Sequence, residues 1–309
     1  MKDVKNIEAS VRGRLQNTAR DTKRQFAEVL QYYGMERFLY RLSKSEHHQR
    51  FILKGALMFT VWDIPSRRRT MDIDFLAYAD NAIPKMEKII REVCETEVVP
   101  DGVVFDPKSV KGGKIKEDAD YEGIRVKFRG NLGTARIPMQ IDIGFGDAVV
   151  PKPKAIDYPV ILDFPKPHLV GYAFETVVAE KFEAMIKLGA LNSRMKDFYD
   201  VWLLISQFTF NGSSLANAIA RTFKNRKTEL PKALPFFAAE IYSDQSDRNR
   251  IWQAFLEKND IRVPEKLKEA TSVIENFLQP VVEATIEEKD FESIWKAPGP
   301  WKNANKGTL

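Results

Sequence analysis

Apolar residues in the first part of the chain recur every three or four positions, which is the spacing of one helix face. The pattern starts at Ile7 and predicts helices over residues 3–44. The short apolar run 51–53 then stops at Lys54-Gly55. We expect a strand there, followed directly by a helix over residues 56–62.

Further along, polar and apolar residues alternate as in a strand. The first such segment is Met71-Asp72-Ile73-Asp74-Phe75-Leu76, and a helix over residues 84–95 follows it, opened by Pro84. Between residues 103 and 145 the alternation returns in VVF, GIRVKFRG and ARIPMQIDIGFGD. The pairs Gly112-Gly113 and Gly130-Asn131 are typical of turns, and we expect them to separate these strands.

The second half of the chain has the period of helices. A proline-rich stretch, residues 151–167, is expected to be an extended linker, and the tail 297–309 is expected to be irregular. We place a boundary near residue 165. Residues 1–165 then form an α/β (α+β) domain, a mixed sheet with flanking helices, and residues 166–309 form a helical C-terminal domain. The helices predicted in it are 172–190, 195–208, 213–226, 248–258 and 264–279.

The composition is that of an ordinary globular protein of about two domains. With 309 residues, 44% of them hydrophobic, the chain is long enough to bury a sizeable core. No stretch approaches the roughly 20 apolar residues of a membrane span, and the N-terminus lacks the apolar core of a secretory signal. Cys94 is the single cysteine, which excludes an internal disulfide framework. We therefore expect a cytoplasmic protein with no membrane partner.

The positive charge is unevenly distributed. The formal net charge is +5, and residues 1–50 alone hold a surplus of that size. Arg67–Arg69 form a second basic run, and a third consists of Lys108, Lys111, Lys114 and Lys116. A basic run is as compatible with a solvated surface as with phosphate binding, so the neighbouring chemistry must decide between them.

Two carboxylates share a predicted strand. Asp72 and Asp74 are two positions apart, so the strand period puts both on one face, about 7 Å apart. Asp142 lies in a similar alternation and completes a triad if its strand is adjacent. Such a set can hold two divalent cations for nucleotidyl transfer, although an acidic pair alone is also common on a solvated edge strand. With three histidines and one cysteine, any metal is expected to be bound by carboxylate oxygens rather than by a zinc-type ligand set.

The glycine turn Lys54-Gly55-Ala56 precedes this acidic strand, and Gly55 permits close backbone approach to a phosphate. Strand, glycine turn, helix and carboxylate strand is the order of nucleotidyltransferases of the DNA polymerase β type. The chain resembles the AbiEii/AbiGii toxin family of nucleotidyltransferases, the toxin half of type IV toxin–antitoxin systems. The resemblance is carried by FILKGALMF at 51–59, RRTMDIDF at 68–75, ETVVAEKFEA at 175–184 and, most strongly, NSRMKDFYD at 192–200.

The resemblance implies roles for residues in four motifs. The first is the glycine turn, where Ala56 offers no hydroxyl, and the second is Asp72-Ile73-Asp74. The third supplies Lys181. The fourth has the form Arg-x-x-Asp-x-x-Asp. Taken together, the residue patterns and the resemblance predict the catalytic set Asp72, Asp74, Asp142, Lys181, Asp197 and Asp200, of which Asp72, Asp74 and Asp142 would bind metal; the predicted nucleotide-binding residues are Lys54, Gly55, Arg68, Thr70, Arg194 and Lys196.

The residues alone also allow plainer interpretations of the later motifs. Lys181 could be a surface lysine paired with Glu180, and Asp197 and Asp200 could be charges that favour a helix N-terminus. In the functional interpretation, Lys181, Arg194 and Lys196 contact a triphosphate, and the two aspartates orient these cations. The active site would then lie between the two domains.

The resemblance further implies a bacterial toxin that transfers a nucleoside monophosphate from an NTP to a hydroxyl, with Mg²⁺ or Mn²⁺ as cofactor. Relatives extend the 3′ end of tRNA and so block translation. The expected partners are therefore tRNA or another RNA acceptor and a cognate antitoxin. Transfer to a protein or small-molecule hydroxyl is one alternative, and an inactive nucleotide-binding module is another. The sequence leaves open the NTP, the tRNA, the oligomeric state and whether Asp142 is a metal ligand or a general base.

Overall fold

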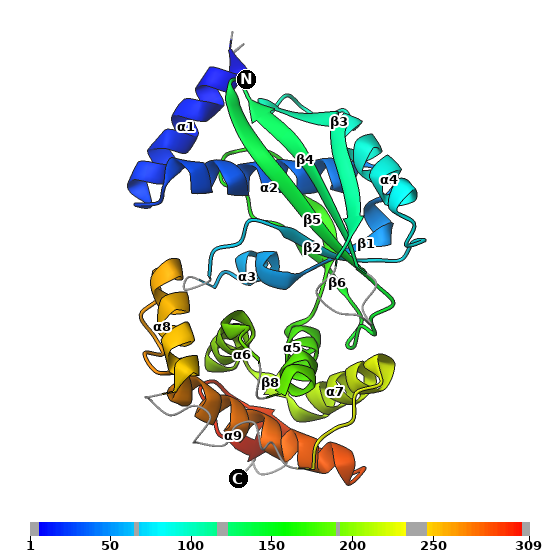
Figure 1. Ribbon diagram of the computed structural model, residues 1–309, viewed down its shortest axis with the longest axis vertical. Coiled ribbons are helices and arrows are strands. Elements are labelled where there is room, and N and C mark those ends of the chain that lie inside the picture. The colour runs from blue at the N-terminus through cyan, green and yellow to red at the C-terminus, as the bar shows by residue number, and fades with distance from the viewer. Residues whose placement is uncertain (1–5, 65–67, 116–122, 190–191, 233–245, 305–309) are drawn as a thin grey trace. The chain divides into compact units, whose positions relative to one another are not determined.

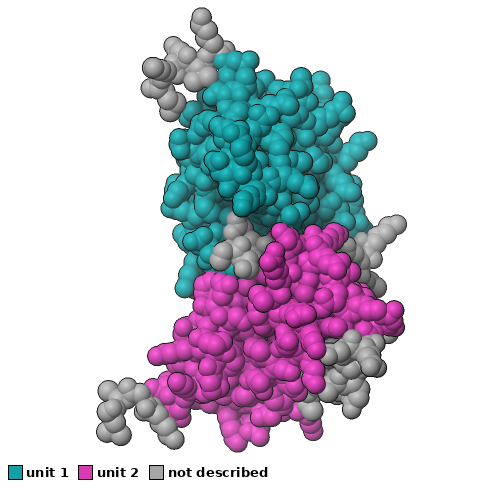
Figure 2. Space-filling model, turned by 90° about the vertical axis from the view of Figure 1, so that its left-hand side faces the viewer, with its two compact units in different colours: residues 1–65, 69–146, 154–171 teal, residues 66–68, 147–153, 172–309 magenta. Residues whose placement is uncertain are grey.

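The computed structural model describes residues 6–64, 68–115, 123–189, 192–232 and 246–304. The chain divides into two compact units, which Figure 2 shows in separate colours. Unit 1 consists of Met1–Pro65, Arg69–Gly146 and Lys154–Gly171. Unit 2 consists of Ser66–Arg68, Asp147–Pro153 and Tyr172–Leu309. The chain thus enters unit 2 for good at Tyr172, a few residues after the boundary expected near residue 165.

The helices predicted at the start of the chain are confirmed. Helix α1 spans Ile7–Asp21, and the side chain of Asn6 caps its N-terminus by accepting the Ala9 N–H. Helix α2 spans Phe26–Lys44 and is buried along most of its length. The later helix α4 spans Ile83–Glu95 and has Pro84 in its first turn, as predicted.

A seven-stranded mixed sheet forms the centre of unit 1. Its order is β3-β4-β5-β2-β1-β7-β6, in which β2 pairs with β5 and β1 with β7 in parallel while the other neighbours are antiparallel (Figure 1). The strands are β1 Phe51–Lys54, β2 Ile73–Ala77, β3 Val103–Lys114, β4 Ile124–Leu132, β5 Ala135–Phe145, β6 Lys154–Asp157 and β7 His168–Gly171. The mixed sheet with flanking helices that the sequence predicted is therefore confirmed.

One face of this sheet packs against helices. Figure 1 shows α2 crossing behind β4 and β5, with α1 packed on α2 and α4 on β3. The ring of Phe38 on α2 lies 5.7 Å from that of Phe105 on β3 and 5.2 Å from that of Phe128 on β4, measured between centroids. The apolar residues of the strands alternate onto this face, so their charged neighbours point to the opposite face.

Two predicted turns are wrong, because glycine serves a different purpose there. Gly112-Gly113 lies inside β3, and Gly130-Asn131 lies inside β4. A Cβ at Gly130 would come within 3.0 Å of the Phe105 ring, so this glycine lets a neighbouring side chain approach the backbone. The β4–β5 turn instead uses Gly133, whose φ is +57°.

Short elements follow β1. A 3₁₀ turn η1, His48–Arg50, leads into β1, and a second one, η2, Gly55–Leu57, leads out of it into α3, Met58–Val61. The helix predicted over residues 56–62 is thus present but is split between 3₁₀ and α geometry. The stretch predicted as an extended linker contains β6, and β7 follows it directly; these two strands form one edge of the sheet.

Unit 2 is mainly helical, as predicted. Its helices are α5 Phe174–Leu188, α6 Met195–Gln207, α7 Gly212–Arg226, α8 Asp247–Asn259 and α9 Leu267–Ile286. A small sheet of order β10-β9-β8 accompanies them, with β8 Phe210–Asn211, β9 Ser293–Trp295 and β10 Trp301–Asn303. The tail was expected to be irregular, which is wrong for residues 301–303, because Trp301 stacks on Phe277 with ring centroids 5.1 Å apart.

Candidate active site

The side chains of the acidic strand point to the faces of the sheet that the sequence predicted. Asp74 lies on β2 between Ile73 and Phe75, which are both buried in the core. The parallel pairing of β2 with β5 makes Asp74 the direct partner of Asp142. Directly paired residues have their side chains on the same face of a sheet. The strand of Asp142 is therefore the adjacent one, which is the condition that the sequence left open.

These two residues belong to a longer row across the sheet. Lys54 on β1 pairs with Asp74, Asp142 pairs with Arg125 on β4, and Arg125 pairs with Gly113 on β3. The order of charges along the row is positive, negative, negative, positive. We call these five positions the transverse row; its members are Lys54, Asp74, Asp142, Arg125 and Gly113.

Gly55 lies directly against Asp74. A Cβ added at Gly55 would come 2.0 Å from Asp74 Oδ2, and the φ of this glycine is +69°. Both the space and the backbone conformation therefore require glycine. The backbone of the glycine turn thus approaches the carboxylate of the acidic strand. Since η2 and α3 together form only a short helical segment, their dipole is a small part of any attraction for phosphate.

Arg125 engages Asp142 through two parallel hydrogen bonds. Its Nε donates to Asp142 Oδ1 at 2.8 Å and its Nη2 donates to Oδ2 at 2.7 Å. This paired geometry is the strong form of a guanidinium–carboxylate contact. Both oxygens of Asp142 are therefore occupied by Arg125, and any metal that bound Asp142 would compete with this arginine.

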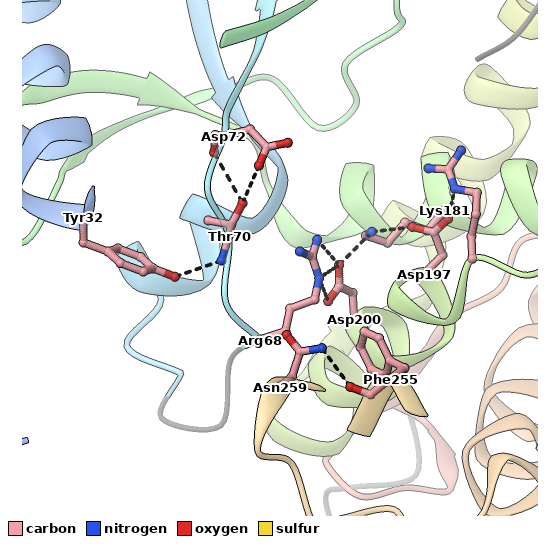
Figure 3. Close-up of polar contacts among 10 residues, drawn as sticks. Tyr32, Arg68, Thr70, Asp72, Lys181, Asp197, Asp200, Phe255 and Asn259 are labelled. Carbon is pink, nitrogen blue, oxygen red and sulfur yellow. Dashed lines mark hydrogen bonds and ion pairs between the residues drawn. The ribbon is translucent and has the colours of Figure 1, made fainter. Parts of the chain in front are cut away.

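Asp72 lies just before β2 rather than within it. Its Oδ1 accepts the Met71 N–H at 3.1 Å, and its Oδ2 accepts from Gln140 Nε2 at 3.4 Å. Thr70 is buried and donates its N–H to the Tyr32 hydroxyl at 3.1 Å, with its own hydroxyl directed at Asp72 (Figure 3). Thr70 therefore fixes the turn that presents Asp72.

The residues of the third and fourth motifs form a second cluster, within unit 2. The Nζ of Lys181 on α5 lies 2.8 Å from both Asp197 Oδ1 and Asp200 Oδ2 (Figure 3). The two aspartates come from α6 and are only 1% exposed. The alternative pairing of Lys181 with Glu180 is not the one observed, because Glu180 lies 3.5 Å from Arg226.

Two arginines complete this cluster. Arg68 donates to both oxygens of Asp200, at 3.0 and 3.1 Å for its closest contacts, and Arg194 Nε lies 2.8 Å from Asp197 Oδ2. Three cations therefore surround two buried carboxylates, which leaves a surplus of positive charge. The side chain of Arg194 is 40% exposed, and the neighbouring Lys196 is exposed as well.

The electrostatics keep this cluster ionised. Burial would lower the pKa of Lys181, but the carboxylates of Asp197 and Asp200 outweigh it, and the pKa is raised above its usual value. Burial would likewise raise the pKa of Asp197, but Lys181 and Arg194 outweigh it, and this pKa is lowered. Removing one member would leave an opposite charge buried without its partner, which typically costs 3–5 kcal/mol.

The predicted site residues are thus gathered in two groups. Unit 1 holds Lys54, Gly55, Thr70, Asp72, Asp74 and Asp142, and unit 2 holds Arg68, Lys181, Arg194, Lys196, Asp197 and Asp200. Sequence reasoning missed Arg125 and Gln140, which hold Asp142 and Asp72. The signal for Arg125 was present, because Arg125, Lys127 and Arg129 alternate with buried Ile124, Val126 and Phe128 along β4.

The donor set in unit 1 fits a hard divalent cation. Carboxylate oxygens are the ligands that Mg²⁺ and Mn²⁺ prefer, and Asp74 and Asp142 offer them on adjacent strands, with Asp74 against the backbone of Gly55 and Asp142 held by Arg125. A different described cluster, Glu46, His47 and Glu92, also has metal-ligand spacing. It is explained by a hydrogen bond between His47 and Glu92, because buried His47 Nδ1 has no partner among the described residues and a metal-bound imidazole normally has one.

Paired acidic strands beside a glycine turn are the arrangement of enzymes that transfer phosphoryl and nucleotidyl groups. Comparison with known families agrees, since the sequence model of the family described as "Nucleotidyl transferase AbiEii toxin, Type IV TA system" matches residues 37–294. The chain belongs to this family and is a nucleotidyltransferase of the toxin type. No curated relative matches it.

Two solved structures, both from Helicobacter pylori, are similar in part. One, described as a candidate nucleotidyltransferase, has a TM-score of 0.45 at 14% identity and covers 84% of this chain and 95% of its own. The other, JHP933, has a TM-score of 0.40 at 12% identity and covers 82% of this chain and 89% of its own. The family assignment rests on the sequence match alone. Within the described residues, no helix is both long and apolar enough to cross a membrane.

Proposed function

We propose that this toxin transfers a nucleoside monophosphate from an NTP to the 3′-terminal hydroxyl of an RNA, with tRNA as the acceptor. The observation that carries the proposal is the pairing of Asp74 with Asp142 on adjacent strands, with the Gly55 backbone against Asp74. In the reaction, the hydroxyl oxygen bonds to the α-phosphorus, the bond from this phosphorus to the bridging oxygen breaks, and pyrophosphate leaves. The hydroxyl proton is released.

Unit 1 carries the acidic residues of this proposal. Asp72, Asp74 and Asp142 would hold Mg²⁺ or Mn²⁺, which would supply positive charge against the phosphate oxygens. Thr70 and Gln140 keep Asp72 in place by hydrogen bonds. Lys54, the partner of Asp74 on β1, offers positive charge beside the phosphates, and the Gly55 turn lets them approach the backbone.

Unit 2 carries a basic cluster of its own, to which we also assign roles. Lys181 is committed to Asp197 and Asp200, so we assign it a positioning role rather than direct contact with the nucleotide. The aspartates in turn hold Arg194 and Arg68. Arg194 and exposed Lys196 are the cations that we assign to the triphosphate. A surplus of fixed positive charge is what a transferring triphosphate requires.

Family membership also suggests the setting. A type IV toxin has a cognate antitoxin, and we infer that one restrains this protein in the bacterial cytoplasm.

The two kinds of acceptor, a small molecule and an RNA, differ in the surface that they require. A small-molecule acceptor would need an enclosed pocket, whereas an RNA acceptor would need an extended basic surface.

The test is incubation of the full chain with total tRNA, Mg²⁺ and each labelled NTP in turn. Asp74→Asn and Asp142→Asn should each reduce labelling at least about a hundredfold, because a lost metal ligand removes several kcal/mol of transition-state stabilisation. The control is Asp80→Asn, which removes an exposed carboxylate outside the row. Incorporation by Asp74→Asn within tenfold of the unmodified protein would overturn the proposed site. Label found in protein instead of RNA would change the acceptor.

A further inference from the structure

A basic concavity lies on β3 and β4 of unit 1. Its volume is about 680 Å³. Six cationic side chains line it: Lys108, Lys111, Lys114, Arg125, Lys127 and Arg129. Among the described residues that line it, none is acidic. On β4 the strand period explains the arrangement, because the residues that alternate with Arg125, Lys127 and Arg129 point into the core.

The described residues neutralise only part of this charge. Arg125 pairs with Asp142, and Arg129 pairs with Asp106 at 2.8 Å. In the part of the chain that the structure describes, no ion pair engages the four lysines of the concavity. All four are exposed. They therefore present several units of positive charge to whatever occupies the concavity.

Two of these lysines are placed where their charges destabilise the fold. Lys111 on β3 and Lys127 on β4 are direct register partners. Like charges directly opposite each other in a sheet are destabilising. Stability of the sheet therefore does not explain this pair, whereas an anion bound between the two ammonium groups does.

The basic N-terminal segment is a poorer candidate for the same role. Arg37 and Arg41 are buried, and Arg41 is held by Asp101 at 2.8 Å. Arg14 pairs with Asp163 and Arg24 with Glu28. Much of the surplus charge seen in residues 1–50 is therefore used within the fold, whereas the lysines of β3 and β4 remain available.

The concavity adjoins the acidic residues of the candidate active site. Arg125 belongs both to its lining and to the transverse row, where it holds Asp142. Two residues further along β4, Lys127 pairs with Gln140, whose side chain donates a hydrogen bond to Asp72. Neighbouring strands lie about 4.8 Å apart, so the lysines and the carboxylates are separated by roughly 10 Å.

We propose that this concavity binds the phosphodiester backbone of the acceptor RNA and leads its 3′ end to the carboxylates. The inference rests on the proposed function for the identity of the acceptor. Several neighbouring lysines can bind the repeated phosphates of an RNA backbone, because each ammonium is a point charge that needs no bidentate partner. Its position next to Asp142 and Asp72 places the bound strand beside the reacting end.

The test measures binding directly, without turnover. Fluorescently labelled total tRNA is titrated with the full-length double variant Lys111→Ala/Lys127→Ala over a range of salt concentrations. Two lost phosphate contacts should flatten the plot of log affinity against log salt by about 1.4–1.8 and weaken binding about tenfold at moderate salt. The melting temperature should stay the same or rise, because the like-charge pair is removed.

Two control variants remove the same charge elsewhere. Lys258→Ala/Lys268→Ala acts on exposed lysines of α8 and α9 in unit 2, and Arg12→Ala/Arg20→Ala acts on exposed arginines of α1. Both should keep the original affinity and salt slope to within about one contact. In labelling assays, Lys111→Ala/Lys127→Ala should raise the KM for RNA and leave kcat nearly unchanged.

An unchanged RNA affinity and slope in Lys111→Ala/Lys127→Ala would overturn the proposal. So would a loss confined to NTP binding, measured without RNA, because it would assign the concavity to the nucleotide. A loss of equal size in Arg12→Ala/Arg20→Ala would place the RNA on α1. RNA binding that depends on Lys111 and Lys127 in a protein that labels no RNA would support this surface and contradict the proposed function.

Discussion

Gly55 is the residue at which the smallest substitution should have the largest effect on the site. A methyl group there would collide with Asp74 Oδ2 and would also strain a backbone with φ of +69°. We expect Gly55→Ala to displace Asp74, to reduce nucleotidyl transfer at least about tenfold, and to destabilise unit 1 by about 1–3 kcal/mol. Transfer to tRNA and urea unfolding of the same preparation measure the two effects.

Gly13 on α1 gives the matched control. No atom lies within 4 Å of a Cβ built at Gly13, and alanine is preferred to glycine within a helix by roughly 1 kcal/mol. Gly13→Ala should therefore keep full activity and gain slight stability. If Gly55→Ala behaved like Gly13→Ala, the contact between the glycine turn and Asp74 would have no role in the reaction.

At this scale, the sequence predicted the carboxylates better than their partners. The alternation around Asp74 determined its face, because the strand period is local. That Asp74 adjoins Asp142 and that Asp142 binds Arg125 depend on strand order and register, which join residues distant in sequence. Lys181 illustrates the same limit, because the sequence left both Glu180 and the pair Asp197 and Asp200 open as its partners, and the structure shows the two aspartates.

Among the elements, strand β10 is the one whose contribution the sequence concealed. Trp301 stacks on Phe277, packs against Trp295 at 5.6 Å between ring centroids, and donates its indole N–H to Phe277 O at 2.8 Å. We expect Trp301→Ala to destabilise unit 2 by about 2–4 kcal/mol, since a large partly buried ring and a hydrogen bond are both lost. Urea unfolding followed by circular dichroism measures the change.

The neighbouring residue separates this effect from a general effect of the tail. Lys302 lies on the same strand and is exposed, so Lys302→Ala should change stability by no more than about 0.5 kcal/mol. Equal stability of both variants would mean that the tail is a dispensable extension, as its irregular sequence first suggested.

Helices and strands with a clear hydrophobic period were predicted well, whereas the turns predicted at Gly112-Gly113 and Gly130-Asn131 were not. The apolar stripe of α4 and Pro84 in its first turn are local signals that predict this helix from sequence. Gly112-Gly113 and Gly130-Asn131 resemble turns, yet they lie within strands, and side chains of other elements approach the backbone at Gly112 and Gly130. A sequence shows that a position requires glycine without showing whether the reason is conformation or close packing.

For the whole molecule, the two units should respond differently to pH. In unit 1, burial raises the pKa of Glu36 from 4.5 to about 7, although Arg37 and the Ile161 N–H oppose the shift. The folded unit then binds a proton that the unfolded chain has released, so this group's stabilisation is complete below pH 4.5 and is lost as pH rises through 7. In unit 2, the lowered pKa of Asp197 has the opposite sign, and its contribution is lost only in acid.

The measurement is hydrogen exchange of α2 amides at pH 5 and pH 8, with the unmodified protein and Glu36→Gln compared at each pH. The variant lacks the titrating group, so its stability relative to the unmodified protein should improve by about 3 kcal/mol at most between these values. Glu95→Gln, an exposed change on α4, is the control. A relative stability that did not change with pH would show that Glu36 is ionised throughout.

The division of the chain into units was only partly predictable from sequence. The shift from strand to helix patterns indicated a boundary near residue 165. Two short segments, Ser66–Arg68 and Asp147–Pro153, belong to unit 2 although they are flanked by residues of unit 1. Such discontinuity arises from contacts such as that of Arg68 with Asp200, which no local pattern reveals.

The transverse row limits where this protein can gain or lose residues. A single insertion within β2, β4 or β5 would turn the following side chains to the opposite face and would exchange a charged row member for an apolar neighbour. Added length can be accommodated at the Gly133 turn or in the irregular part of β3 between Asp106 and Lys111, because neither place is within a paired strand segment that carries a row member. Among natural variants of this toxin, differences in length should therefore accumulate at those two places and be absent from the strand segments that carry Asp74, Arg125 and Asp142.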